Sequence, residues 1–160
     1  MIMIGWLTQT YIGKLIATML VSMVPVIELR GGIPYGVGFG LSYPEAFIAA
    51  FIGNVIPVPF IMLFLRQIFD WLRRFEKTRG TIERLEARAH LKGQKVEKYR
   101  ALGLFLLVAV PLPGTGAWTG ALVASVLDMR MKTAIPIIAL GVVTAGLIVL
   151  GVTHGIRIMV

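Results

Sequence analysis

Two uncharged apolar stretches of about twenty residues each restrict what this chain can fold into. They cover residues 46–65 and 133–152, and each is long enough to cross the ~30 Å hydrocarbon core of a bilayer as one α-helix. The chain is 57% apolar with a mean hydropathy of +0.83, whereas soluble domains are roughly 45–50% apolar. The sequence therefore predicts an all-α integral membrane protein that forms a single membrane domain.

The positive charges of the chain are concentrated in one stretch. Of the 16 lysines and arginines, 11 lie between Arg66 and Arg100, and apolar runs flank this stretch on both sides. Cytoplasmic loops of membrane proteins carry such an excess of positive charge. We therefore expect a cytoplasmic linker at about residues 67–99, folded as basic amphipathic helices on the lipid headgroups, and no nucleic-acid partner.

The remaining apolar stretches are broken by glycine and proline into pieces of about 9–13 residues, too short to span a bilayer. Residues 15–41 are interrupted by Glu28-Leu29-Arg30-Gly31-Gly32. Residues 102–127 are interrupted by Pro111-Leu112-Pro113-Gly114-Thr115-Gly116. We expect each to form a re-entrant helical hairpin, in which protein or water satisfies the irregular backbone at membrane depth.

The two halves of the chain repeat the same order of elements. A shift of 86 positions places Lys14 on Arg100 and Ser42 on Asp128. Each half then consists of a short helix, a break, a second short helix, a capping residue and a full span. The expected division is repeat 1 at about 1–66, the linker, and repeat 2 at about 100–160, with Ser42 and Asp128 as helix N-caps.

Charge also predicts how the repeats are oriented. Arg130 and Lys132 follow the second hairpin and place its end on the cytoplasmic side with the linker, whereas Glu45 begins the first span on the opposite side. The second repeat is then inverted relative to the first, a plan that recurs in secondary transporters. A rival layout makes every apolar piece a full span and puts Glu28 and Arg30 in a surface loop.

Glu28 and Arg30 are the strongest functional candidates. An ionisable group inside a membrane costs about 2.5–3.5 kcal/mol even on the mildest scale. Residues two apart do not face each other on a helix, so we expect the chain to unwind at Gly31 and Gly32. Glu28 would then carry a proton or cation, with Arg30 as its partner or as an anion ligand. The alternative is a static ion pair that fixes the hairpin tip.

The second break offers hydrogen-bonding groups without charge. Thr115 and Thr119 carry hydroxyls, and Gly114 and Gly116 permit close backbone approach. The helix that starts near Ala117 would direct its N-terminus, which favours carboxylates and phosphates, toward the membrane interior. Alternatively, the glycines at four-residue intervals form packing seams. The other candidate pathway residues are Pro34, Asn54, Pro111 and Pro113.

The sequence lacks the residue patterns that metal binding and nucleophilic catalysis require. His90 and His154 have no acidic or cysteine partner at metal spacing, so we expect no metal and no cofactor. No serine, histidine and acid are arranged for nucleophilic catalysis, so an enzyme is not expected. The amide of Asn54 is expected to hydrogen-bond to a neighbouring helix.

Residues 27–36 and 111–120 resemble the two signatures of a family called "putative small multidrug export protein", and the resemblance covers essentially the whole chain. That family is distantly similar to the DedA superfamily of membrane proteins. The superfamily is associated with paired re-entrant hairpins and with lipid scrambling, undecaprenyl-phosphate recycling or proton-coupled transport. Glu28 matches the acidic position of the first DedA hairpin, whereas the second hairpin lacks the arginines of the DedA pattern.

These observations predict a small multi-pass transporter of the cell membrane. It would export a small substrate, coupled to protons or ions, through a site formed by the two hairpins. The alternatives are a DedA-like flippase or scramblase for phospholipids or polyprenyl phosphates, and a non-transporting membrane scaffold. The expected partners are membrane lipids and a small-molecule or lipid substrate, and a homodimer is left open.

Overall fold

A computed structural model describes residues 9–72, 93–112 and 114–159. Within these residues the secondary structure is helical throughout, with no strand. The helices are α2 Tyr11–Met23, α3 Glu28–Gly38, α4 Tyr43–Val55, α5 Pro57–Leu72, α7 Gly93–Ala109, α8 Ala117–Val126 and α9 Met131–Met159. The predicted all-helical class is confirmed.

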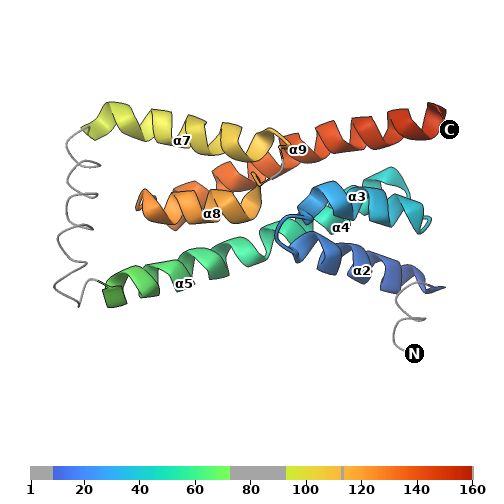
Figure 1. Ribbon diagram of the computed structural model, residues 1–160, viewed down its shortest axis with the longest axis horizontal. Helices are drawn as coiled ribbons and strands as arrows, with labels where there is room; N and C mark the ends of the chain where they lie inside the picture. Colours follow the sequence, from blue (N-terminus) through green and yellow to red (C-terminus); the bar gives the residue numbers. More distant parts are fainter. Residues whose placement is uncertain (1–8, 73–92, 113, 160) are drawn as a thin grey trace.

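Two helical paths run the length of the molecule (Figure 1). α4 continues into α5 and gives an apolar path of 26 residues, Tyr43–Ile68, while α9 provides the 25 residues Met131–Gly155. Both paths are long and apolar enough to cross a membrane, which makes them candidates for the two predicted spans. α4 and α5 are separated at Ile56, because Pro57 has no N–H to donate and its ring crowds the preceding turn.

The first predicted N-cap is confirmed and the second is wrong. Glu45 accepts the backbone N–H of Ser42 at 2.8 Å and completes a capping box at the start of α4. Asp128 does not cap α9, which begins only at Met131. Asp128 instead ends α8 with a φ of 50°, and its N–H bonds the carbonyl of Ser125 at 3.1 Å. This left-handed residue belongs to a Schellman turn.

A second Schellman turn ends α3. Gly40, at φ 90°, donates its N–H to Val37 at 3.0 Å, and the next N–H, of Leu41, reaches the carbonyl of Gly36 at 3.0 Å. Gly40 therefore corresponds to Asp128, an offset of 88 rather than 86. The offset of 86 relates only the helices before the breaks, because the second break is longer than the first.

α2 and α3 form a first hairpin at one end of the molecule, where the described part of α9 also ends (Figure 1). At that end the Tyr11 hydroxyl donates to Glu45 at 2.7 Å. The ring of His154 meets Tyr43 edge-on, with the ring centroids 5.1 Å apart. The starts of α2 and α4 and the end of α9 therefore share one end of the bundle.

α7 and α8 form a second hairpin at the opposite end (Figure 1). There, Arg66 of α5 donates to the carbonyl of Met129 at 2.7 Å, and Arg100 of α7 donates to the carbonyl of Leu127 at 3.3 Å. Arg100 thus bonds the negative, carbonyl end of α8, where cations are favourable, and Arg66 bonds the turn that follows this helix. The end of the first span and the turn from α8 to α9 lie together.

Small residues allow the helices to pack closely. A Cβ at Gly36 would lie 3.0 Å from the Cβ of Ala46 on α4, and one at Gly32 would lie 3.1 Å from the Cβ of Ser22 on α2. The predicted packing seam is therefore confirmed for these two glycines. Beyond its own hairpin, α3 also packs against α9, and α8 also packs against α5. Each hairpin therefore contacts the span of the other half.

Candidate functional site

The tip of the first hairpin lies at residues 24–27, closer to the N-terminus than predicted. Gly31, Gly32 and Pro34 all belong to α3, so the expectation that the chain unwinds at the two glycines is wrong. Pro25 accounts for the shift, because a proline disfavours the helical conformation of the residue before it. Val24 is accordingly extended, with φ −71° and ψ 128°.

The backbone of this tip is strained. Val26 has a φ of 77° and Glu28 a φ of 49°, in the left-handed region that side chains with a branched Cβ rarely enter. Such conformations cost on the order of 1–3 kcal/mol each, and they persist only where surrounding contacts fix them. Glu28 is held by its own N–H, which donates to the carbonyl of Val24 at 3.0 Å, and by side-chain contacts with the second hairpin.

The Glu28 carboxylate lies at the N-terminus of α8. Its side chain is buried, and its Oε1 accepts the backbone N–H of Trp118 at 3.3 Å, with the N–H of Ala117 beside it. Gly116 precedes these residues at φ 146°, and a Cβ there would overlap the carboxylate. The predicted role of a helix N-terminus is thus filled by a carboxylate of the protein itself.

Arg30 reaches into the second break. Its guanidinium donates to the backbone carbonyls of Leu112 and Thr115, and to the Thr115 hydroxyl at 3.0 Å. Glu28 and Arg30 form no direct ion pair within the described part of the chain. The predicted partnership is therefore indirect, because each of the two residues bonds the second hairpin.

The second hairpin also donates a hydrogen bond to the first. The indole N–H of Trp118 donates to the carbonyl of Met23, the last residue of α2, at 3.0 Å. The three contacts interlock the two tips, which lie near the middle of the long axis in Figure 1. Trp118 and Met23 were absent from the predicted site. The signal for Trp118 was an indole donor placed directly after the glycine-rich break.

The remaining predicted residues have varied surroundings. Thr119 donates to the carbonyl of Gly114 at 2.8 Å and so closes the break onto α8. Pro111 is half-buried at the start of the break, and Pro113 lies outside the described residues. Gly120 packs against Val108 and Ile138. In the second hairpin, Gly116 therefore contacts Glu28, whereas Gly120 contributes to helix packing.

Asn54 departs from its prediction. Its side chain is fully buried, yet neither its oxygen nor its nitrogen has a hydrogen-bond partner among the described residues. The expected interhelical hydrogen bond is therefore not formed.

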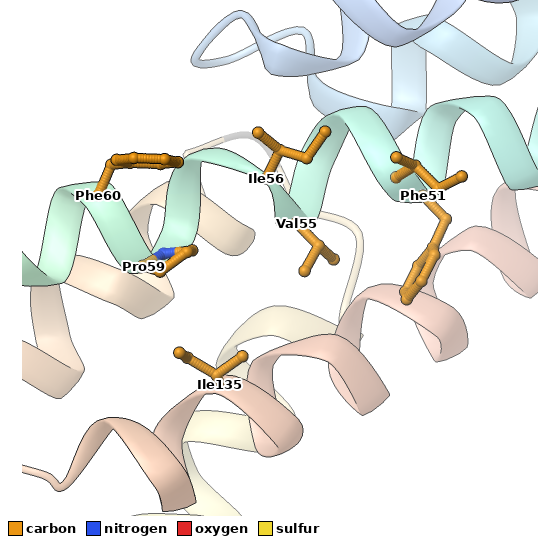
Figure 2. A pocket seen from close by; sticks show the side chains of 7 residues that line it. Phe51, Val55, Ile56, Pro59, Phe60 and Ile135 are labelled. Carbon is orange, nitrogen blue, oxygen red and sulfur yellow. The ribbon is translucent and has the colours of Figure 1, made fainter.

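A groove of about 410 Å³ opens beside the bend between α4 and α5. Figure 2 shows it between the bend and Ile135 of α9. Its lining is entirely apolar: Phe51, Ile52, Val55, Ile56, Pro59, Phe60 and Ile135. No side chain here can orient a polar ligand, so the interlocked tips are the candidate site.

A family profile described as "Putative small multi-drug export protein" matches residues 28–148. The chain belongs to this family. No curated protein and no solved structure matches it. The matched segment begins at Glu28 and includes Arg30, the second break and Trp118. The description of this export family, together with the two apolar spans, indicates a membrane transporter rather than an enzyme.

Proposed function

We propose that this member of the small multi-drug export family is a proton- or ion-coupled exporter of a small substrate. Its central site is formed by two re-entrant hairpins that meet inside the membrane. The observation that carries this proposal is the buried Glu28 carboxylate at the start of α8. Ionisable groups at membrane depth are costly and typically serve function.

Helix lengths support the re-entrant arrangement. α3 has 11 residues and α8 has 10, so at about 1.5 Å per residue they extend only ~15–17 Å. That is about half of the ~30 Å apolar core. Each hairpin also begins and ends at the same end of the bundle, through the Tyr11–Glu45 contact for one and the Arg100–Leu127 contact for the other.

Binding and release of a proton or cation at Glu28 would couple the movement of that ion to export of the substrate. While Glu28 is ionised, the N–H groups that start α8 stabilise it and hold the two tips together. Protonation of Glu28, or binding of a cation to it, weakens this attraction and frees the start of α8 to move. Because each hairpin packs on the span of the other half, separation of the tips would shift one half against the other, as alternating access requires.

Vesicle transport tests the proposal. Purified protein is reconstituted, and efflux of the fluorescent amphipathic cation ethidium is followed under an imposed proton or sodium gradient. We expect gradient-driven efflux, and its loss in Glu28→Gln, because the neutral amide can neither release and rebind a proton nor balance a cation. Glu45→Gln, at the exposed end of α4, is the matched control and should keep most of the activity.

The same vesicles separate the alternatives. A fluorescent phospholipid that equilibrates between leaflets without any gradient, while ethidium stays inside, would replace the exporter with a scramblase. If the folded protein neither exports ethidium nor scrambles phospholipids, the non-transporting scaffold is the remaining alternative.

Topology is tested by labelling single cysteines, for which the natural chain offers a clean background because it has none. We expect Pro44→Cys and His154→Cys to react with an impermeant maleimide from outside the cell, and Arg130→Cys and Lys132→Cys to react only after permeabilisation. All four residues are exposed, and the basic pair is expected to face the cytoplasm. Labelling of Pro44 and Arg130 from the same side would contradict the inverted arrangement.

A further inference from the structure

Asn54 presents an unpaired amide in the interior of the first span. Its exposed fraction is 0%, and both Oδ1 and Nδ2 lack a hydrogen-bond partner among the described residues. An unpaired buried polar group is unfavourable, so native structures rarely keep one without a purpose. The position of Asn54 indicates what this purpose is.

Two prolines next to Asn54 deprive two carbonyl oxygens of their usual helical donors. α4 ends at Val55 and α5 begins at Pro57. In a continuous helix the N–H of residue 57 would bond the carbonyl of Gly53, and that of residue 59 would bond the carbonyl of Val55. Both positions are proline and have no N–H. The end of α4 therefore directs oxygen atoms, and the negative end of its dipole, into the middle of the span.

Packing between α3 and α4 places Asn54 relative to the hairpin tip. The two helices run in opposite directions, and their small residues face each other in pairs. Gly36 lies opposite Ala46, and Gly32 lies opposite Ala50, where a Cβ on the glycine would be 3.4 Å from the alanine Cβ. Each step of four residues toward the start of α3 is matched by four residues toward the end of α4.

One more step along these rows is expected to bring Glu28 level with Asn54. Both side chains are buried. Arg30, the nearest positive group on α3, is held by the carbonyls of Leu112 and Thr115. Besides the N–H groups of Ala117 and Trp118 that the Glu28 carboxylate already accepts, the groups expected at this level are therefore one carboxylate, one amide oxygen and the carbonyls at the end of α4, each of which can offer an oxygen to a cation.

We propose that Glu28, Asn54 and the carbonyl end of α4 form a binding site for a monovalent cation of sodium size. Oxygen donors select hard cations, and a single carboxylate balances a single positive charge in an apolar interior. Within the described residues no cluster of three histidine, cysteine or acidic side chains could hold a transition metal. The inference rests on the proposed export function, because the cation would be the ion that drives it.

Thermal unfolding in detergent tests this site without any transport assay. The wild-type protein is heated in sodium chloride, potassium chloride or choline chloride at equal ionic strength. We expect a saturable rise in Tm with sodium, on the order of 3–6 °C at ten times its dissociation constant. A smaller rise is expected with potassium, and none with choline.

Three variants make the test specific. Asn54→Leu should lose the sodium-dependent rise and melt higher than wild type in choline, because the unpaired amide is gone. Asn54→Asp keeps an oxygen donor and should keep the rise, which covers the case in which leucine prevents folding. Ser125→Ala removes a buried hydroxyl that bonds Ala121 on α8, and it should leave the rise unchanged.

The outcomes separate the cation site from the exporter. Equal melting of the wild type in sodium and choline, or a full sodium response in Asn54→Leu, would overturn the site. Proton-driven ethidium efflux together with either of these results would leave the exporter standing without a sodium site. A normal sodium response in a protein that transports nothing would instead refute the proposed function.

Discussion

Gly116→Ala is expected to destabilise the folded protein by about 2–6 kcal/mol and to abolish export. Two costs add. Gly116 has φ 146° and ψ −159°, a conformation that is essentially limited to glycine and costs other residues about 1–3 kcal/mol. Its new Cβ would also overlap the Glu28 carboxylate, and forced overpacking adds about 1–3 kcal/mol. Unfolding in detergent and ethidium efflux measure the two effects.

Gly114→Ala is the matched control for this substitution. Gly114 also has a positive φ, 82°, but no atom lies within 4 Å of a Cβ built there. Its replacement should therefore cost only the backbone strain, about 1–2 kcal/mol. Adding Glu28→Ala to Gly116→Ala removes the overlapping carboxylate and should restore part of the stability, although not the export. Equal destabilisation at the two glycines would show that the carboxylate does not lie against Gly116.

Arg30→Met is expected to destabilise the protein by about 1.5–3 kcal/mol, because a half-buried guanidinium loses its charged hydrogen bonds to the second break. Methionine keeps an unbranched side chain but leaves the carbonyls of Leu112 and Thr115 without their donor. Hydrogen exchange should then increase at the start of α8, because the second break is no longer tied to α3. Melting temperature and exchange rates measure these effects.

Arg66→Met is the comparison variant, at the end of the first span. Arg66 is likewise half-buried, but its guanidinium donates to one backbone carbonyl, that of Met129, whereas that of Arg30 donates to two carbonyls and a hydroxyl. The expected loss is only about 0.5–1.5 kcal/mol. If Arg66→Met proves as damaging as Arg30→Met, the larger set of contacts made by Arg30 does not hold the two tips together.

Much of the fold can be predicted from the sequence, because the lengths of the apolar runs and the positions of the charged residues are visible along the chain. The uncharged runs at 46–65 and 133–152 predict the two long paths, and the Ser42–Glu45 capping box is formed as expected. The hairpins follow from apolar runs that are too short to span. The position of the first tip does not follow so readily, since Gly31 and Gly32 tolerate a helix while Pro25 ends one.

The contacts of the site were harder to predict. Spacing within a sequence relates near neighbours, so Glu28 was paired with Arg30. The structure joins Glu28 to Trp118, 90 positions away, and Trp118 to Met23, 95 positions away. Nothing in the local pattern indicates these partners. They arise because the two hairpins meet tip to tip, which only the packing of each hairpin on the opposite span determines.

The contact between Glu28 and Trp118 also limits how the chain can mature during synthesis. A ribosome adds about 5–20 residues per second, so roughly 5–18 s pass between the addition of Glu28 and that of Trp118. Throughout this interval the newly inserted first half holds an acidic residue whose partner does not yet exist. A product truncated after α5 would keep that defect permanently, and we expect it to be degraded rather than to accumulate as a stable half.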